Sequence, residues 1–128
     1  MFIVVFGGMV LTQNDFKIGL KAVLKILDKW GCNENQISVL LCFKNKDDIS
    51  AANQSDLTQD QVIRISYILN IHGGLRQVFS NPDNVYGFMT MKNQHLLFNG
   101  QTPLSLLLEG EHSDFEAVMN HVLNLGNF

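Results

Sequence analysis

The residues of this chain that could do chemistry are mainly histidines and cysteines. They are His72, His95, His112 and His121, with Cys32 and Cys42. No two histidines have the close spacing of a metal motif, neither cysteine lies beside one, and the two cysteines do not form a zinc pattern. We therefore expect no metal site and no bound cofactor.

Nucleophilic and phosphate-binding motifs give no stronger signal. Gly7 and Gly8 are not followed by the Lys and Ser or Thr of a phosphate loop. Asp47 and Asp48 are adjacent, so on a helix their side chains point apart and form no acid/base pair. The sequence thus predicts a protein that is not an enzyme. A small enzyme or ligand-binding helical domain stays open as an alternative, because catalytic residues can assemble from distant positions.

Composition limits the possible classes of protein. The 128 residues are 46% hydrophobic and 16% charged, which is enough apolar material for one domain or for two small lobes that share a core. The formal net charge of -3 is unlike that of a dedicated nucleic-acid binder. Charge is uneven, however, because six of the nine basic residues lie between Lys17 and Lys46, and four acids lie between Glu109 and Glu116.

The first residues, 1–11, are apolar apart from their glycines. This run is too short to span a membrane, and no basic residue precedes it as in a signal peptide. We expect an extended arm or edge strand, with strand character in Phe2–Phe6, which packs on the body or on a second copy. Two cysteines are too few for a disulfide scaffold, which favours a cytoplasmic protein.

Helical patterns run through almost all of the remaining chain. Apolar residues recur at the helical period from Asp15 to Trp30, with lysines on the opposite side. Capping patterns at Asn33 and Thr58 predict a short helix from Glu34 to about Cys42 and a long helix after Thr58. A short helix around 47–53 is a weaker prediction. In the long helix we expect Val62, Ile65, Leu69 and Phe79 to face inward.

Further signals divide the second half of the chain. Gly73 and Gly74 predict a kink or break, because each glycine costs roughly 1 kcal/mol in a helix interior. Asn81-Pro82 and Thr102-Pro103 predict helix starts, and a loop is expected between them at 91–101. Ser113 and Glu116 predict a capping box at the start of the last helix.

Two stretches carry a family resemblance. The first combines residues 22–31, which end in Lys-Trp-Gly, with residues 57–71, which include Arg-Ile-Ser-Tyr-Ile-Leu. The second comprises Asn93 and the run Phe98–Gly110, with its Gly-Gln-Thr-Pro-Leu sequence and leucine-rich helix. Together they resemble the antitoxins of the Xre/MbcA/ParS group, from about Phe16 onward.

The resemblance implies an all-α fold and a role in binding another protein. It implies a helix-turn-helix-like lobe at 15–72 after an apolar arm at 1–14, and a helical toxin-binding domain at 73–128. The implied partner is a cognate toxin, in many members an NAD-consuming protein with an RES domain whose active site the antitoxin covers. The resemblance also implies a homodimer and repression of the antitoxin's own operon.

The resemblance also assigns candidate contact residues. Those expected to contact the toxin are Asn93, Phe98, Gly100, Thr102, Pro103, Asn127 and Phe128. The alternative function is a DNA-binding repressor that acts through its N-terminal lobe. Its expected phosphate contacts are Lys17, Lys21, Lys25, Lys44 and Lys46. Asp47 and Asp48 oppose this alternative, because they occupy the segment that would face the phosphates.

Overall fold

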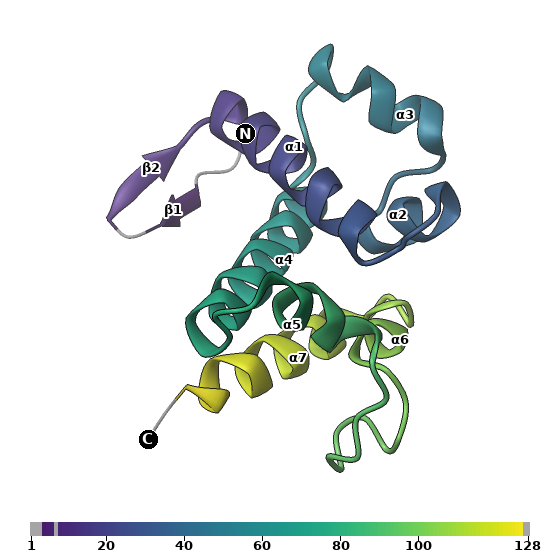
Figure 1. The fold of residues 1–128 in the computed structure, drawn as a ribbon. Coiled ribbons are helices and arrows are strands. Elements are labelled where there is room, and N and C mark those ends of the chain that lie inside the picture. Colours follow the sequence, from purple (N-terminus) through teal and green to yellow (C-terminus); the bar gives the residue numbers. More distant parts are fainter. Residues whose placement is uncertain (1–3, 7, 127–128) are drawn as a thin grey trace.

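The computed structural model describes residues 4–6 and 8–126, and this part of the chain is almost entirely helical (Figure 1). The all-α prediction is thus confirmed. Seven α-helices and two short 3-10 helices are present in these residues: α1 Gln13–Lys29, α2 Glu34–Leu41, α3 Lys46–Ser50, η1 Ala51–Asn53, α4 Gln59–Val78, α5 Pro82–Gly87, η2 Phe88–Thr90, α6 Pro103–Leu107 and α7 His112–Leu125.

A small antiparallel hairpin precedes the helices. Strand β1, Val4–Phe6, pairs with β2, Met9–Leu11, in the register Val5 opposite Val10. The strand predicted at Phe2–Phe6 is present in its described part, and β2 was not predicted. In Figure 1 the hairpin extends sideways from the start of α1.

Side-chain caps set most helix starts. Asn33 and Thr58 form the predicted capping boxes with Gln36 and Gln61, and Thr12 forms an unpredicted box with Asp15 at the start of α1. Such a cap contributes about 1 kcal/mol. Asn81-Pro82 and Thr102-Pro103 also start helices as predicted.

The capping box predicted at Ser113 is wrong. Helix α7 begins one residue earlier, at His112, and its N-cap residue Glu111 makes no side-chain capping hydrogen bond. The His112 ring instead contacts the Asp60 carboxylate on α4. This contact joins the start of α7 to α4.

Helix α4 is the central element, and the break predicted in it is also wrong. The helix is continuous from Gln59 to Val78 and packs against both α1 and α7. A Cβ added to Gly74 would lie 2.9 Å from Val122 Cγ1 on α7. The glycine therefore lets the two helices approach closely, and this packing offsets its poor helix propensity.

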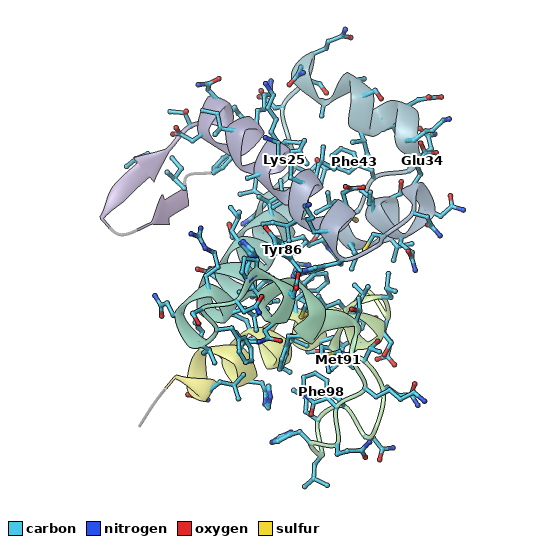
Figure 2. All side chains as sticks on the ribbon, in the orientation of Figure 1. Lys25, Glu34, Phe43, Tyr86, Met91 and Phe98 are labelled. Atoms are coloured by element: carbon cyan, nitrogen blue, oxygen red, sulfur yellow. The ribbon has the colours of Figure 1, made fainter. Side chains whose placement is uncertain are left out.

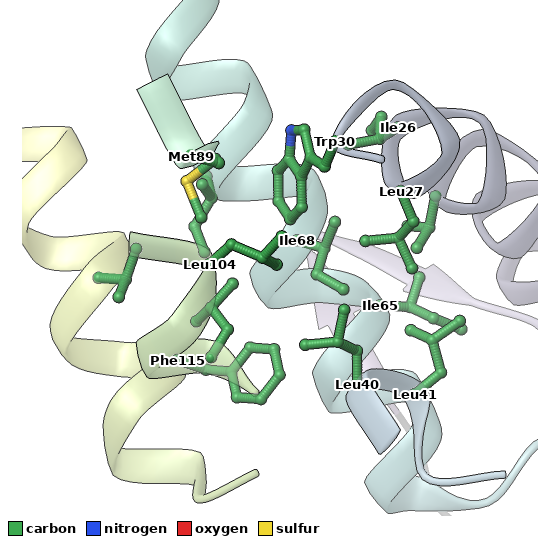
Figure 3. Close-up of a cluster of buried hydrophobic side chains, with 14 of the residues drawn as sticks. Ile26, Leu27, Trp30, Leu40, Leu41, Ile65, Ile68, Met89, Leu104 and Phe115 are labelled. Atoms are coloured by element: carbon green, nitrogen blue, oxygen red, sulfur yellow. The ribbon is translucent and has the colours of Figure 1, made fainter. Parts of the chain in front are cut away.

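One hydrophobic core joins the N-terminal and C-terminal halves. Leu27, Trp30 and Leu40 from the first half lie in the same buried cluster as Met89 and Phe115 from the second half (Figure 3). The expected boundary between residues 72 and 73 lies inside α4, whose buried face serves both halves. Leu69 is an exception to the predicted inward face, because 36% of it is exposed. No helix in the described residues is long and apolar enough to cross a membrane.

Candidate functional site

The candidate site is built on the loop at 91–101, which backbone hydrogen bonds close at its base. The Asn93 N–H donates to the Gln101 carbonyl at 3.0 Å, and the Gly100 N–H donates to the Asn93 carbonyl at 2.9 Å. The Asn93 side-chain oxygen also accepts the His95 N–H at 2.9 Å. Asn93 therefore holds both ends of the loop.

The chain returns to the base of the loop through two residues of positive φ. Asn99 has φ 50° and Gly100 has φ 81°, a region that Asn and Gly enter more readily than other residues. The N–H groups of Phe98 and Asn99 both donate to the His95 carbonyl at 2.9 Å.

An aromatic cluster fastens the loop to α7. The Phe98 ring is 3% exposed and meets the His121 ring edge-on, with centroids 5.1 Å apart. The His95 ring lies 4.5 Å from the His121 ring. Burial and the neighbouring His95 lower the pKa of His121, which favours the neutral ring in this packing.

Three apolar side chains of the loop and of α7 are exposed. Leu96 is 93% exposed, Met91 63% and Leu123 45%. Met91 also borders a hollow of about 220 Å³ whose lining comprises Phe79, Asn84, Phe88, Met91, Lys92 and Asn93. Apolar side chains displayed on a fixed backbone suit a protein-binding surface.

The toxin-contact residues predicted from sequence differ in their accessibility. Phe98 and Pro103 are buried, while Asn93, Gly100 and Thr102 are half-buried. Thr102 caps α6 by accepting the Ser105 N–H at 3.1 Å. Asn127 and Phe128 lie outside the described residues.

The exposed apolar residues Met91, Leu96 and Leu123 were not predicted as contacts. Leu96 and Leu97 are adjacent leucines, yet only Leu96 is fully exposed, whereas Leu97 is half-buried against the core. The only signal in the sequence is the occurrence of these leucines in a segment already expected to be a loop.

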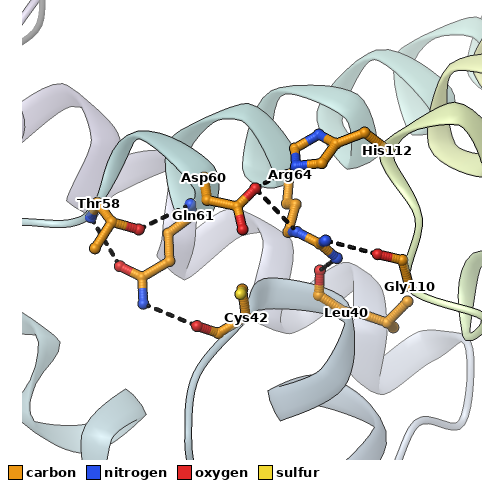
Figure 4. A network of polar contacts seen from close by, with 8 residues as sticks. All are labelled: Leu40, Cys42, Thr58, Asp60, Gln61, Arg64, Gly110 and His112. Carbon is orange, nitrogen blue, oxygen red and sulfur yellow. Dashed lines mark hydrogen bonds and ion pairs between the residues drawn. The ribbon is translucent and has the colours of Figure 1, made fainter.

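A polar network joins this region to the N-terminal helices (Figure 4). Arg64 on α4 is 6% exposed. Its guanidinium donates to the Gly110 carbonyl at 2.7 Å and to the Leu40 carbonyl at 3.3 Å. Its Nε lies 3.5 Å from the Asp60 carboxylate. One buried cation therefore connects α2, α4 and the turn before α7.

The same network brings Cys42 and His112 to Asp60. Burial raises the pKa of Asp60, but hydrogen bonds from Cys42 and His112 and the charge of Arg64 outweigh this effect, so the pKa of Asp60 lies below its usual value.

The two cysteine thiols have raised pKa values. The hydrogen bond to Asp60 raises the pKa of the Cys42 thiol, and burial raises the pKa of Cys32 to about 11. Neither thiol is activated as a nucleophile. In the described residues no three potential ligands form a metal cluster.

The candidate phosphate contacts differ in their surroundings. Lys17 donates to the Asn53 carbonyl at 3.2 Å, and Lys46 lies 3.7 Å from the Glu34 carboxylate. Lys21, Lys25 and Lys44 are exposed, whereas Asp47 and Asp48 occupy the first turn of α3. In Figure 2, Lys25 and Glu34 lie at the opposite end of the molecule from Met91 and Phe98.

Comparison with known proteins identifies the C-terminal segment. Residues 74–125 match the family model described as the antitoxin Xre/MbcA/ParS C-terminal toxin-binding domain. The match includes the loop, its aromatic anchor and all of α7. No curated protein matches the chain. The family match supports an antitoxin with a toxin-binding domain in this segment.

Proposed function

We propose that this chain, whose residues 74–125 belong to the Xre/MbcA/ParS toxin-binding family, neutralises a cognate toxin through the loop at 91–101 and the adjoining end of α7. The observation that carries the proposal is the location of exposed Met91, Leu96 and Leu123 inside the matched segment. These three side chains make the proposed contact, and Asn93, Phe98 and Gly100 position them.

The energetics of such a contact are favourable. Burying one exposed leucine stabilises a complex by about 1.5–3 kcal/mol, before the costs of association. The loop needs little further ordering, because its base is hydrogen bonded and Phe98 is already buried. Pre-ordering of this kind reduces the entropic cost of binding. A few apolar side chains on a fixed loop can therefore give a tight complex.

The mode of inhibition is the finer part of the proposal. We propose occlusion, in which the C-terminal lobe lies over the toxin's active site and excludes its substrate. The resemblance supports an NAD-consuming toxin with an RES domain as the partner. Thr102 and Pro103 contribute by fixing the start of α6 directly after the loop. Asn127 and Phe128 are proposed to extend the contact beyond α7.

The test is inhibition of the toxin by the purified chain. The toxin is obtained by capture from native lysate with the tagged chain, is identified by mass spectrometry, and is then produced separately. We expect the chain to abolish NAD consumption at a stoichiometric ratio, and a chain that lacks residues 125–128 to inhibit more weakly while it stays folded. Capture of no toxin by a folded bait, or a bound toxin that stays fully active, would contradict the proposal.

The exposed lysines of α1 favour DNA binding as a second, weaker candidate function. Lys21 and Lys25 are exposed on one helix and could contact phosphates. Asp47 and Asp48 oppose such contacts through α3. We expect a gel shift only at low salt, with equal affinity for operator and unrelated DNA. A shift that is specific for upstream DNA at physiological salt would establish the repressor function instead.

A further inference from the structure

A hollow of about 480 Å³ lies at the corner between the end of α4 and α5. On α4 its lining residues His72 and Arg76 are four residues apart, so they share one face, and Phe79 follows as the C-cap residue. On α5 the lining residues Pro82 and Tyr86 likewise share a face. The hollow is therefore framed by two helix faces that meet at the turn around Ser80.

One residue that lines this hollow, His72, carries an unsatisfied polar atom. The His72 ring stacks on the Tyr86 ring with centroids 5.2 Å apart. Its Nδ1 atom is buried and has no hydrogen-bond partner among the described residues. Burial and the nearby Arg76 lower the pKa of His72, which favours the neutral ring. A buried polar atom without a partner costs free energy, and a bound partner can remove that cost when side chains readjust.

The charge of the hollow is positive. Arg76 is exposed, forms no ion pair within the described residues, and no carboxylate lines the hollow beside it. The acidic residues of the C-terminal half that surround Glu109–Glu116 belong to α7 and the turn before it. Asp83 follows Pro82 in the first turn of α5 but does not line the hollow, so the lining itself carries only the positive charge of Arg76.

The hollow continues toward the proposed toxin-binding surface. Phe79 lines both this hollow and the smaller one beside Met91, which Asn84 and Phe88 line from the other side of α5. Lys92 is the only charged residue in the lining of the smaller hollow. The two hollows thus share Phe79 in their lining, and each has one cation and aromatic walls.

We propose that these two hollows form one docking groove for an extended segment of the partner toxin, which carries an acidic residue next to an aromatic one. Arg76 pairs with the carboxylate, and the aromatic side chain packs on Tyr86 and Pro82. The second hollow takes an apolar side chain against Phe79 and Phe88. The inference rests on the proposed antitoxin function and extends it by assigning a second contact and its chemistry. Continuity through Phe79 favours a polypeptide segment over a small anion.

Charge reversal tests the groove in the full-length chain. The affinity of the purified toxin is measured for wild type, Arg76→Glu and the control Lys21→Glu, which reverses an exposed charge on α1. We expect Arg76→Glu to weaken binding at least about tenfold, Arg76→Lys to recover part of that loss, and the control to bind like wild type. Unchanged affinity for Arg76→Glu overturns the groove but leaves the proposed function intact.

Photo-crosslinking identifies the occupant. A benzophenone amino acid replaces Ser80 at the hollow, and a control chain carries it at Asn53. We expect only the Ser80 position to crosslink to the toxin, within a peptide that holds an acidic residue beside an aromatic one. Three results would each overturn the inference. The toxin could bind without this crosslink, or the crosslinked peptide could lack an acidic residue. The third is a small anion that the complex retains in native mass spectra. Failure to bind any toxin would overturn both this inference and the proposed function.

Discussion

The loop at 91–101 and the helix α3 region are both exposed and both follow a turn, yet they display opposite chemistry. The loop presents Leu96 and Met91 on a backbone closed by hydrogen bonds. Helix α3 presents Asp47 and Asp48, and its neighbour Lys46 is paired with Glu34. Apolar side chains on a rigid loop suit a protein partner, whereas carboxylates at a helix start repel a phosphate backbone. The comparison favours the C-terminal half as the location of the proposed protein contact.

Besides the shared hydrophobic core, the buried Arg64 side chain links α2, α4 and the turn before α7, and its removal has the largest expected effect. Arg64→Ala leaves the carbonyls of Leu40 and Gly110 and the carboxylate of Asp60 without their buried partner. We expect the free energy of unfolding to fall by about 3 kcal/mol, which urea denaturation measures. Arg76→Ala, at an exposed residue, is the control and should change the free energy of unfolding by less than about 0.5 kcal/mol. Equal effects of the two substitutions would contradict a bridging role.

The adjacent glycines of α4 separate packing from helix propensity. Gly73 has open space where a Cβ would be, so Gly73→Ala should stabilise the fold by about 0.5–1 kcal/mol. In Gly74→Ala the new Cβ would clash with the stiff Val122 side chain. We therefore expect the free energy of unfolding to fall by about 1 kcal/mol. Thermal unfolding of both variants checks the opposite signs. Stabilisation by both would show that α4 and α7 do not need the close approach.

The loop turn can be weakened without change at the exposed contacts. Asn99→Ala places a residue that disfavours positive φ at a position with φ 50°, at an expected cost of about 1 kcal/mol. Asn99→Gly is the matched control and should retain the wild-type stability. We expect toxin affinity to fall several-fold for alanine but not for glycine, as measured by titration calorimetry. Equal affinities would mean that the turn conformation does not matter for binding.

The smallest expected effect is the dependence of stability on pH through Asp60. The pKa of Asp60 in the folded chain lies below its unfolded value of 3.8. The Asp60 carboxylate therefore contributes to the free energy of unfolding above pH 3.8, and this contribution is lost as the pH falls through the lower folded pKa. Wild type should therefore lose more stability than Asp60→Asn between about pH 5 and pH 2.5. The urea midpoints of wild type and Asp60→Asn, measured across this pH range, test the predicted difference. Parallel curves for the two proteins would contradict a stabilising role for this carboxylate.

Local signals predicted the fold better than the site. Caps at Asn33, Thr58 and Thr102 depend on neighbouring residues, so the sequence was sufficient to find those helix starts. The errors at Ser113 and Gly74 have one cause. In each case a contact between distant helices, of His112 with Asp60 or of α4 with α7, decided the outcome against local preference.

The candidate site was harder to predict because exposure depends on tertiary packing. The family resemblance correctly indicated a toxin-binding segment, which the family match at 74–125 confirms. It did not distinguish Phe98, which is buried, from Leu96, which faces solvent two residues away. That difference arises from the hydrogen bonds to His95 and from the position of His121 on α7. Neither can be read from spacing along the chain.

The most direct test of the central claim is the affinity of the toxin for Leu96→Asp and Val39→Asp. Both residues are exposed and apolar, but Val39 lies on α2, outside the matched segment. We predict that Leu96→Asp weakens binding at least about tenfold and that Val39→Asp has no effect. Equal affinities for the two variants, or a loss confined to Val39→Asp, would show that the toxin does not bind at this loop.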